Sequence, residues 1–293
     1  MTWLSLAFGA AMVWGLVNLC DKAVVDHEVK DGLVAALCCG IPGSAVLGGA
    51  SFLVGSPRQL VPGGLLLGPA YLLSLWLYYE GMNREEVSRF VPTLSVDTVI
   101  VAVLSFIFLG ERLAPIDYAG ILSVAAGAIV LSTDDISLSK DFLSSPKALG
   151  LALLAATAFA GRDVGLKLLS SSAGYPSLLA SLGAGGVATG LVLLLLRLER
   201  FRTFSSRGEE HLVGIGVLSG VGYVLFALAI ESGPVSLSSA VVKSKNIVVL
   251  VGSLGIEAFS SATLHESLGT ADILQKASGT GLIAAGLAAI QVL

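Results

Sequence analysis

Charged and amide side chains interrupt several long apolar stretches of this sequence, and these are the residues that could do chemistry. They are Asn18 in the stretch 3–21, Asp97 in 88–109, Arg162 and Asp163 in 147–168, and Lys243, Lys245 and Asn246 in 235–257. A charge in hydrocarbon costs about 2.5–3.5 kcal/mol, so each one needs a partner or a purpose. Asp97 and Lys243 are expected to bind the charged groups of a small molecule, with Asp97 as an alternative proton carrier, or to form a purely structural ion pair. The chemistry indicated is noncovalent solute binding, and no residue is predicted to be catalytic.

Helical spacing predicts which of these side chains share a face. Arg89, Thr93 and Asp97 are four residues apart and lie on one face of their stretch. Helical spacing points Lys245 about 200° away from Lys243, so both cannot face the same cavity; we favour Lys243 as the cavity-facing cation and leave Lys245 open. A polar stripe on the same helix consists of Ser236, Ser239, Lys243 and Asn246.

Aromatic residues add a second candidate lining. Tyr71, Leu75, Tyr78 and Tyr79 share a face of the stretch 63–80, where phenols can line a cavity or anchor the helix at a membrane surface, and both readings stay open. Trp14 is deep in its stretch and is the better cavity candidate. The predicted substrate-binding set is Trp14, Asn18, Tyr78, Thr93, Asp97, Asp163, Tyr223, Ser239, Lys243 and Asn246.

The elements that must position these residues follow from composition. Of the 293 residues, 55% are hydrophobic and 13% are charged, with a mean hydropathy of +0.87, which is too apolar for a soluble domain. Ten stretches are each long enough to cross a bilayer as a helix. They are 3–21, 33–54, 63–80, 88–109, 115–132, 147–168, 177–197, 212–230, 235–257 and 273–292. We therefore predict an all-α integral membrane protein with ten transmembrane helices.

A repeated segment divides this chain in two. Leu109-Gly110-Glu111-Arg112-Leu113 precedes Gly120 and Gly127, and Leu264-His265-Glu266-Ser267-Leu268 precedes Gly279 and Gly286. A polar linker at 133–146 separates the repeats 1–132 and 147–293. Because five spans is an odd number, the second repeat must enter the membrane from the opposite side, which predicts two inverted repeats around a central cavity. Glu111 and Glu266 are expected to cap the helix that follows each of them, and the glycines to pack helices closely.

The repeat resembles a known domain. The five-helix half, the aromatic-rich third span, the Gly-Glu-Arg-Leu segment and the Gly-x6-Gly spacing are similar to the EamA-type domain of the drug/metabolite transporter superfamily. The second half fits more loosely, because His265-Glu266-Ser267 replaces Gly-Glu-Arg. The resemblance implies ten helices around a central cavity and a secondary transporter for small metabolites, such as amino acids or sugars, in the cell membrane.

The remaining expectations concern partners and alternatives. We expect a small-molecule substrate, with or without proton coupling, a lipid bilayer, no nucleic acid, no metal and no cofactor, in a monomer or homodimer. One alternative is an intramembrane enzyme acting on a lipid-linked phosphate, suggested by Pro42-Gly43-Ser44, although Ala45 stands where such an enzyme needs arginine. Another is a sugar or nucleotide-sugar transporter. Most lysines and arginines follow odd-numbered spans, which places both termini outside, whereas the resemblance places them in the cytoplasm.

Overall fold

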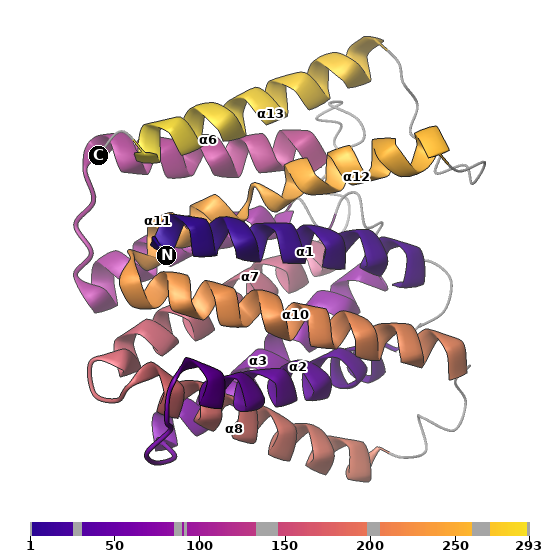
Figure 1. Cartoon of the computed structure of the whole chain (residues 1–293). Helices are drawn as coiled ribbons and strands as arrows, with labels where there is room; N and C mark the ends of the chain where they lie inside the picture. The colour runs from indigo at the N-terminus through magenta and orange to yellow at the C-terminus, as the bar shows by residue number, and fades with distance from the viewer. Residues whose placement is uncertain are drawn as a thin grey trace.

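The computed structural model describes residues 2–25, 31–84, 90, 93–132, 146–197, 206–259 and 270–291. A helix or a pair of helices occupies each expected span, and the described residues contain no strand (Figure 1). The helices are α1 (Trp3–Val25), α2 (Gly32–Val54), α3 (Pro62–Met82), α5 (Asp97–Leu104), α6 (Pro115–Ser132), α7 (Pro146–Ser170), α8 (Tyr175–Leu196), α10 (Ser206–Ser232), α11 (Val235–Val242), α12 (Lys245–Phe259) and α13 (Thr270–Gln291). The prediction of an all-helical chain is confirmed.

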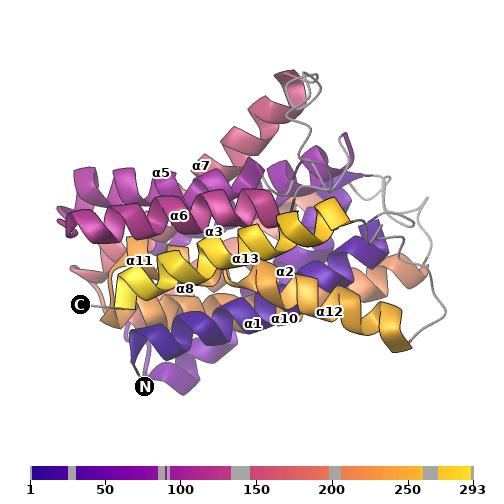
Figure 2. The same ribbon diagram turned by 90° about the horizontal axis from the view of Figure 1, so that it is seen from above.

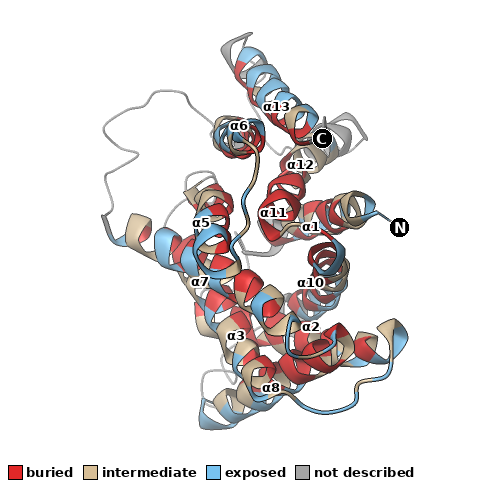
Figure 3. Cartoon of the chain, turned by 90° about the vertical axis from the view of Figure 1, so that its left-hand side faces the viewer, coloured by how far each residue is buried: buried red, intermediate tan, exposed pale blue. Residues whose placement is uncertain are grey.

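The surface of this bundle is apolar. Among the described residues, six helical segments are long and apolar enough to cross a membrane, one of which, Val235–Gly252, runs from α11 into α12. Two shorter apolar segments span Leu94–Leu109 and Pro115–Leu131. Leu53 is 89% exposed and Phe52 is 72% exposed, a placement that hydrocarbon accepts and water does not. Viewed along the bundle, buried residues face the centre and exposed ones face outward (Figure 3). The chain is a multi-pass helical membrane protein.

Helices of the two halves pack on each other in antiparallel pairs. A Cβ at Gly120 would lie 2.9 Å from the Gly286 carbonyl oxygen, and one at Gly127 would lie 2.7 Å from that of Gly279. These contacts hold α6 against α13, side by side in Figures 1 and 2. The expectation that these glycines pack helices closely is confirmed, and the contact lies between the halves.

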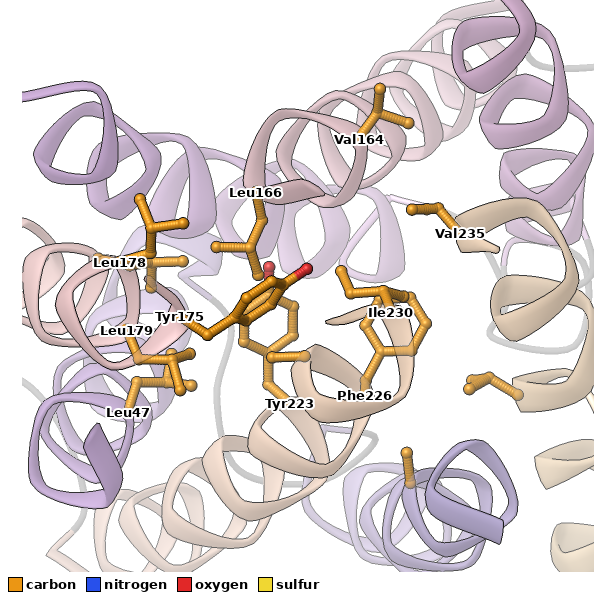
Figure 4. Close-up of a cluster of buried hydrophobic side chains, with 14 of the residues drawn as sticks. Leu47, Val164, Leu166, Tyr175, Leu178, Leu179, Tyr223, Phe226, Ile230 and Val235 are labelled. Carbon is orange, nitrogen blue, oxygen red and sulfur yellow. The ribbon is translucent and has the colours of Figure 1, made fainter. Parts of the chain in front are cut away.

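A second antiparallel pair lies on the other side of the bundle, where α2 packs on α8. A Cβ at Gly183 would meet Gly48, and one at Gly190 would meet Ile41. A buried apolar cluster adjoins this contact and draws on α1, α2, α5, α7, α8, α10 and α11 (Figure 4). Figure 4 shows Leu166, Leu178 and Tyr223 converging on it. The halves are thus joined by continuous packing.

Replacing Gly68 with alanine is expected to destabilise the bundle severely. A Cβ at this position would overlap backbone atoms of α8, including the Leu182 carbonyl oxygen at 2.7 Å, and backbone cannot move aside as a side chain can. We expect a loss of about 3 kcal/mol or more, measured by thermal unfolding in detergent. Gly49→Ala is the matched control, because nothing lies within 4 Å of a Cβ there, and it should be neutral or stabilising by up to about 1 kcal/mol. Equal melting temperatures for the two variants would contradict this packing.

Candidate functional site

Two helices are interrupted near their middles. The 3₁₀ turn η1 (Leu94–Val96) stands directly before α5, and the π-helical turn η2 (Ser105–Leu109) follows it. Between α11 and α12, the Asn246 amide donates to the Lys243 carbonyl at 3.1 Å, three residues back instead of four. A 3₁₀ turn rotates the chain by more degrees per residue than an α-helix does. Side chains near each break therefore do not follow the spacing of a continuous helix.

A central cavity of about 140 Å³ lies beside both breaks. It is lined by residues of α1, α2, α3, α7 and α10, together with residues on either side of the two breaks. Nine of the ten predicted site residues line it: Trp14, Asn18, Tyr78, Asp97, Asp163, Tyr223, Ser239, Lys243 and Asn246. Thr93 precedes η1 and lies outside the lining, and Arg89 lies outside the described residues.

The position of Lys245 differs from the one predicted from the sequence. Continuous helical spacing predicted that Lys243 and Lys245 cannot face the same cavity, yet both line it. The reason is the 3₁₀ turn at Lys243 and Ser244, which ends α11 before Lys245 begins α12. The cavity therefore receives both ammonium groups.

Asp97 and Lys243 form an ion pair across the cavity. The Lys243 Nζ lies 2.6 Å from Asp97 Oδ1 and 2.8 Å from Oδ2, so both carboxylate oxygens are engaged. The Thr98 hydroxyl donates to Oδ1 at 3.2 Å. Asp97 begins α5 and Lys243 directly follows α11, so the pair joins opposite halves of the sequence. The arrangement suits a charge pair that holds the halves together and that a charged solute could compete for.

A second ion pair stands on α7. Nε and Nη2 of Arg162 lie 2.8 and 2.7 Å from Asp163 Oδ1, and the Tyr223 hydroxyl donates to the same oxygen at 3.3 Å. The guanidinium lies 4.2 Å above the centre of the Tyr223 ring, with Phe159 and Tyr71 also within 6 Å. Such cation–π contacts stabilise a desolvated guanidinium. The sequence had marked Arg162 as a charge inside a span, but only its neighbour Asp163 entered the predicted set.

A third charged group, Asp21, was missed. Its carboxylate accepts hydrogen bonds from the Tyr79 hydroxyl at 3.1 Å and the Tyr78 hydroxyl at 3.4 Å, and the Cys39 thiol lies 3.0 Å from the Tyr79 hydroxyl. Asp21 is 3% exposed. It stands at the last position of the expected span 3–21 and was not considered among the candidate site residues; α1 continues to Val25. Tyr78 lines the cavity, which agrees with the first of its two interpretations, cavity lining, and not with membrane anchoring.

Trp14 contributes an aromatic wall. Its indole Nε1 donates to the Ser219 carbonyl at 3.2 Å, which fixes the ring against α10. The Phe226 ring lies 5.7 Å from it, and Tyr71 and Tyr223 stack with their centroids 6.0 Å apart. The cavity thus combines charged side chains with a broad apolar surface.

Two charged residues cap helix ends at the elbow between α10 and α11. The Glu111 carboxylate accepts hydrogen bonds from the Val235 amide at 2.8 Å and from the Ser236 amide and hydroxyl at 3.3 and 2.5 Å. The Lys167 ammonium donates to the Ile230 carbonyl at 2.5 Å and to neighbouring carbonyls at the end of α10. Negative charge at a helix start and positive charge at a helix end are the favourable arrangement.

The prediction that Glu111 caps a helix is confirmed, but the predicted helix was wrong. Glu111 caps α11 of the other half, whereas α6, the helix that follows it, is capped by Asp117, whose Oδ2 accepts from the Ala114 amide at 3.0 Å. The reason is the tertiary structure, which places the start of α11 beside the end of η2. Glu266 lies outside the described residues.

Comparisons with known proteins complete the description. Residues 1–133 match the EamA-like transporter family. A protein of Sinorhizobium sp. named "Uncharacterized transporter in cobO 3'region" is 30% identical over 69 residues, which are 24% of this chain and 46% of that protein. The match therefore spans about half the length of that relative. The fold is similar to that of a protein whose crystal structure has been solved, with a TM-score of 0.72. The two sequences are 16% identical, and the match covers 99% of this chain and 96% of that one. That likeness shows a shared fold.

Proposed function

From the match of residues 1–133 to the EamA-like transporter family, we propose that this chain is a secondary transporter that carries a small polar or charged metabolite across the cell membrane by alternating access. The observation that carries the proposal is the cavity, in which the two halves bring opposite charges together at helix breaks. An amino acid or a related compound is the substrate class we expect first, bound by Asp97, Lys243 and their predicted neighbours. Sugars and nucleotide sugars are the alternative within the superfamily.

The proposed architecture is a pair of inverted repeats, residues 1–132 and 147–293, joined by the linker 133–146. Corresponding helices of the two halves, α2 with α8 and α6 with α13, pack antiparallel, as an axis perpendicular to them requires. The first span of each half packs on the third span of the other half: α1 packs on α10, and α3 packs on α7. Both central helix breaks occupy the fourth span of their half. Apart from Pro146, the first residue of α7, the linker lies outside the described part of the chain.

The enzyme alternative has less support. The family match and the name of the Sinorhizobium relative support a transporter. Pro42-Gly43-Ser44 lies inside α2, where Ser44 is fully buried and a Cβ at Gly43 would lie 2.6 Å from the Tyr71 hydroxyl. This segment serves close packing between helices, which is a poor setting for holding a phosphate.

The test of the proposal is solute movement by the purified protein. A thermal-shift screen against amino acids, sugars, nucleotides and organic cations identifies ligands, because binding stabilises the folded state by mass action. The ligands it identifies are then offered as radiolabelled solutes to proteoliposomes. We expect one class to stabilise the protein and to enter the vesicles without ATP. Failure of every solute to move, with turnover of a lipid-linked phosphate instead, would favour the enzyme.

The Glu111 cap joins the two halves at the elbow, and we expect it to open and close during alternating access, so its loss should shift the conformational equilibrium. Spin labels at the exposed positions Arg112 and Ser232 report the separation across the elbow. Glu111→Ala removes three hydrogen bonds between the halves and should broaden the distance distribution towards longer values, with a loss of about 1–2 kcal/mol in stability. Asp117→Ala is the matched control, since it removes a cap within one half and should leave the distance unchanged. An unaltered distance in Glu111→Ala would show that the cap is static.

A further inference from the structure

The charges that line the cavity are not all paired. It holds three carboxylates and three cations, and two ion pairs account for four of these six groups. Asp21 and Lys245 remain. Among the described residues, the Lys245 ammonium has neither a hydrogen bond nor an ion pair. The Asp21 carboxylate accepts hydrogen bonds from two phenols alone.

Resting on the proposed transport function, we propose that the cavity takes an organic anion together with one proton, the anion at Lys245 and the proton on Asp21. The anionic group is a carboxylate or a phosphate, attached to an apolar body that the aromatic walls accommodate. This narrows the proposed substrate from amino acids and related compounds to those with a net negative charge. Asp21 therefore takes the proton-carrying role that the sequence had offered to Asp97.

The surroundings of Asp21 favour a proton over a substrate group. Both carboxylate oxygens already accept a phenol hydroxyl, and the residue is 3% exposed, so little of it is open to a solute. The ionisable groups that face it are Tyr78 and Tyr79 from α3, Cys39 from α2, Cys20 from α1 and Lys245 from α12. Of these only Lys245 is a cation, and it is not in contact with the carboxylate. A buried carboxylate without a contacting cation is the one that gains most from a proton.

Lys245 has the opposite character. Its side chain is partly exposed and lines the cavity, while the other lysine, Lys243, is engaged by both oxygens of Asp97. A carboxylate or phosphate entering the cavity meets Lys245 as the available cation.

The two events support each other electrostatically. With Asp21 ionised, positive and negative charges in the cavity are equal in number, and an added anion would leave an uncompensated buried charge. Protonation of Asp21 leaves one cation in excess, which the anion then neutralises. Because uncompensated buried charge is unfavourable, proton and anion are expected to bind as a pair.

Calorimetry on the purified protein tests this pairing with four probes of similar size: phenylacetate, phenyl phosphate, phenylalanine and phenethylamine. We expect one of the two anions to bind more tightly than the zwitterion and the amine. Its affinity should rise about tenfold for each unit that the pH falls while Asp21 is mostly ionised, and titrations in buffers of different ionisation enthalpy should count about one proton taken up. Asp21→Asn should bind the same anion tightly at every pH with no proton uptake, and Lys245→Gln should lose the binding.

Conservative variants guard against misfolding. Asp21→Glu and Lys245→Arg keep the charges and should keep pH-dependent anion binding. An infrared band of a protonated carboxyl that grows as the pH is lowered in the wild type, and is missing in Asp21→Asn, is the ligand-free check. Equal affinity for all four probes, no detectable binding of either anion, or loss of binding in Asp21→Asn would each overturn the inference. Transport of another solute class in proteoliposomes would leave the proposed function standing, whereas absence of any transport would remove it.

Discussion

Replacing Lys243 by alanine is expected to abolish transport in a protein that still folds and inserts. The substitution removes the ammonium that binds both oxygens of Asp97. Truncating one partner of a buried, hydrogen-bonded charge pair costs about 2–5 kcal/mol, and part of this cost should appear as lower stability because Asp97 is left unpaired. If Lys243 also binds the charged group of the solute, a loss of about 2 kcal/mol in that contact lowers substrate affinity about 30-fold. Lys245 is near enough to interact with Asp97 electrostatically, which limits the damage to folding. Uptake into proteoliposomes and thermal unfolding in detergent measure the two effects separately.

The double variant Asp97→Asn/Lys243→Ala separates a binding role from a structural one. Without either charge, nothing is left unpaired, so stability should return towards the wild-type value while transport stays lost. Recovery of transport in the double variant would show that the pair only holds the halves together. Glu80→Gln is the control, because it removes an ion pair whose arginine, Arg84, is 55% exposed, and it should change neither property.

Replacing Arg162 by methionine is expected to cause the largest loss of stability among the charge substitutions. It leaves the buried Asp163 carboxylate with only the Tyr223 hydroxyl, 3.3 Å away, and breaking a buried pair from one side costs about 3–5 kcal/mol. The cation–π contact with Tyr223 is lost as well. Thermal unfolding of the variant in detergent gives the change.

Two further variants make this result interpretable. Arg162→Met/Asp163→Leu removes both charges and should recover most of the stability without recovering transport, because the cavity has lost its polar wall. Arg84→Met, at an exposed ion pair, should cost at most about 1 kcal/mol. A single Arg162→Met variant as stable as the wild type would show that water reaches Asp163 freely.

Hydropathy made the helices predictable. In a bilayer the backbone must pair within each segment, so apolar stretches of sufficient length become helices whatever surrounds them, and the expected spans coincide with observed helices to within a few residues at most ends. The cost of a charge in hydrocarbon likewise made most of the site predictable. Asp97, Asp163 and Lys243 had to face something other than lipid, and all three line the cavity.

Local breaks and distant contacts were not predictable in the same way. The sequence by itself determined which segments are helices and which charges avoid lipid, because those depend on hydrophobicity summed over each segment. Only the tertiary structure decided that Lys245 joins Lys243 in the cavity, that Glu111 caps α11 instead of α6, and that Asp21 is enclosed by two phenols. Each of these depends on a single 3₁₀ turn or on contacts between helices far apart in the chain. The free energies of such contacts come from neighbours that a one-dimensional pattern does not place.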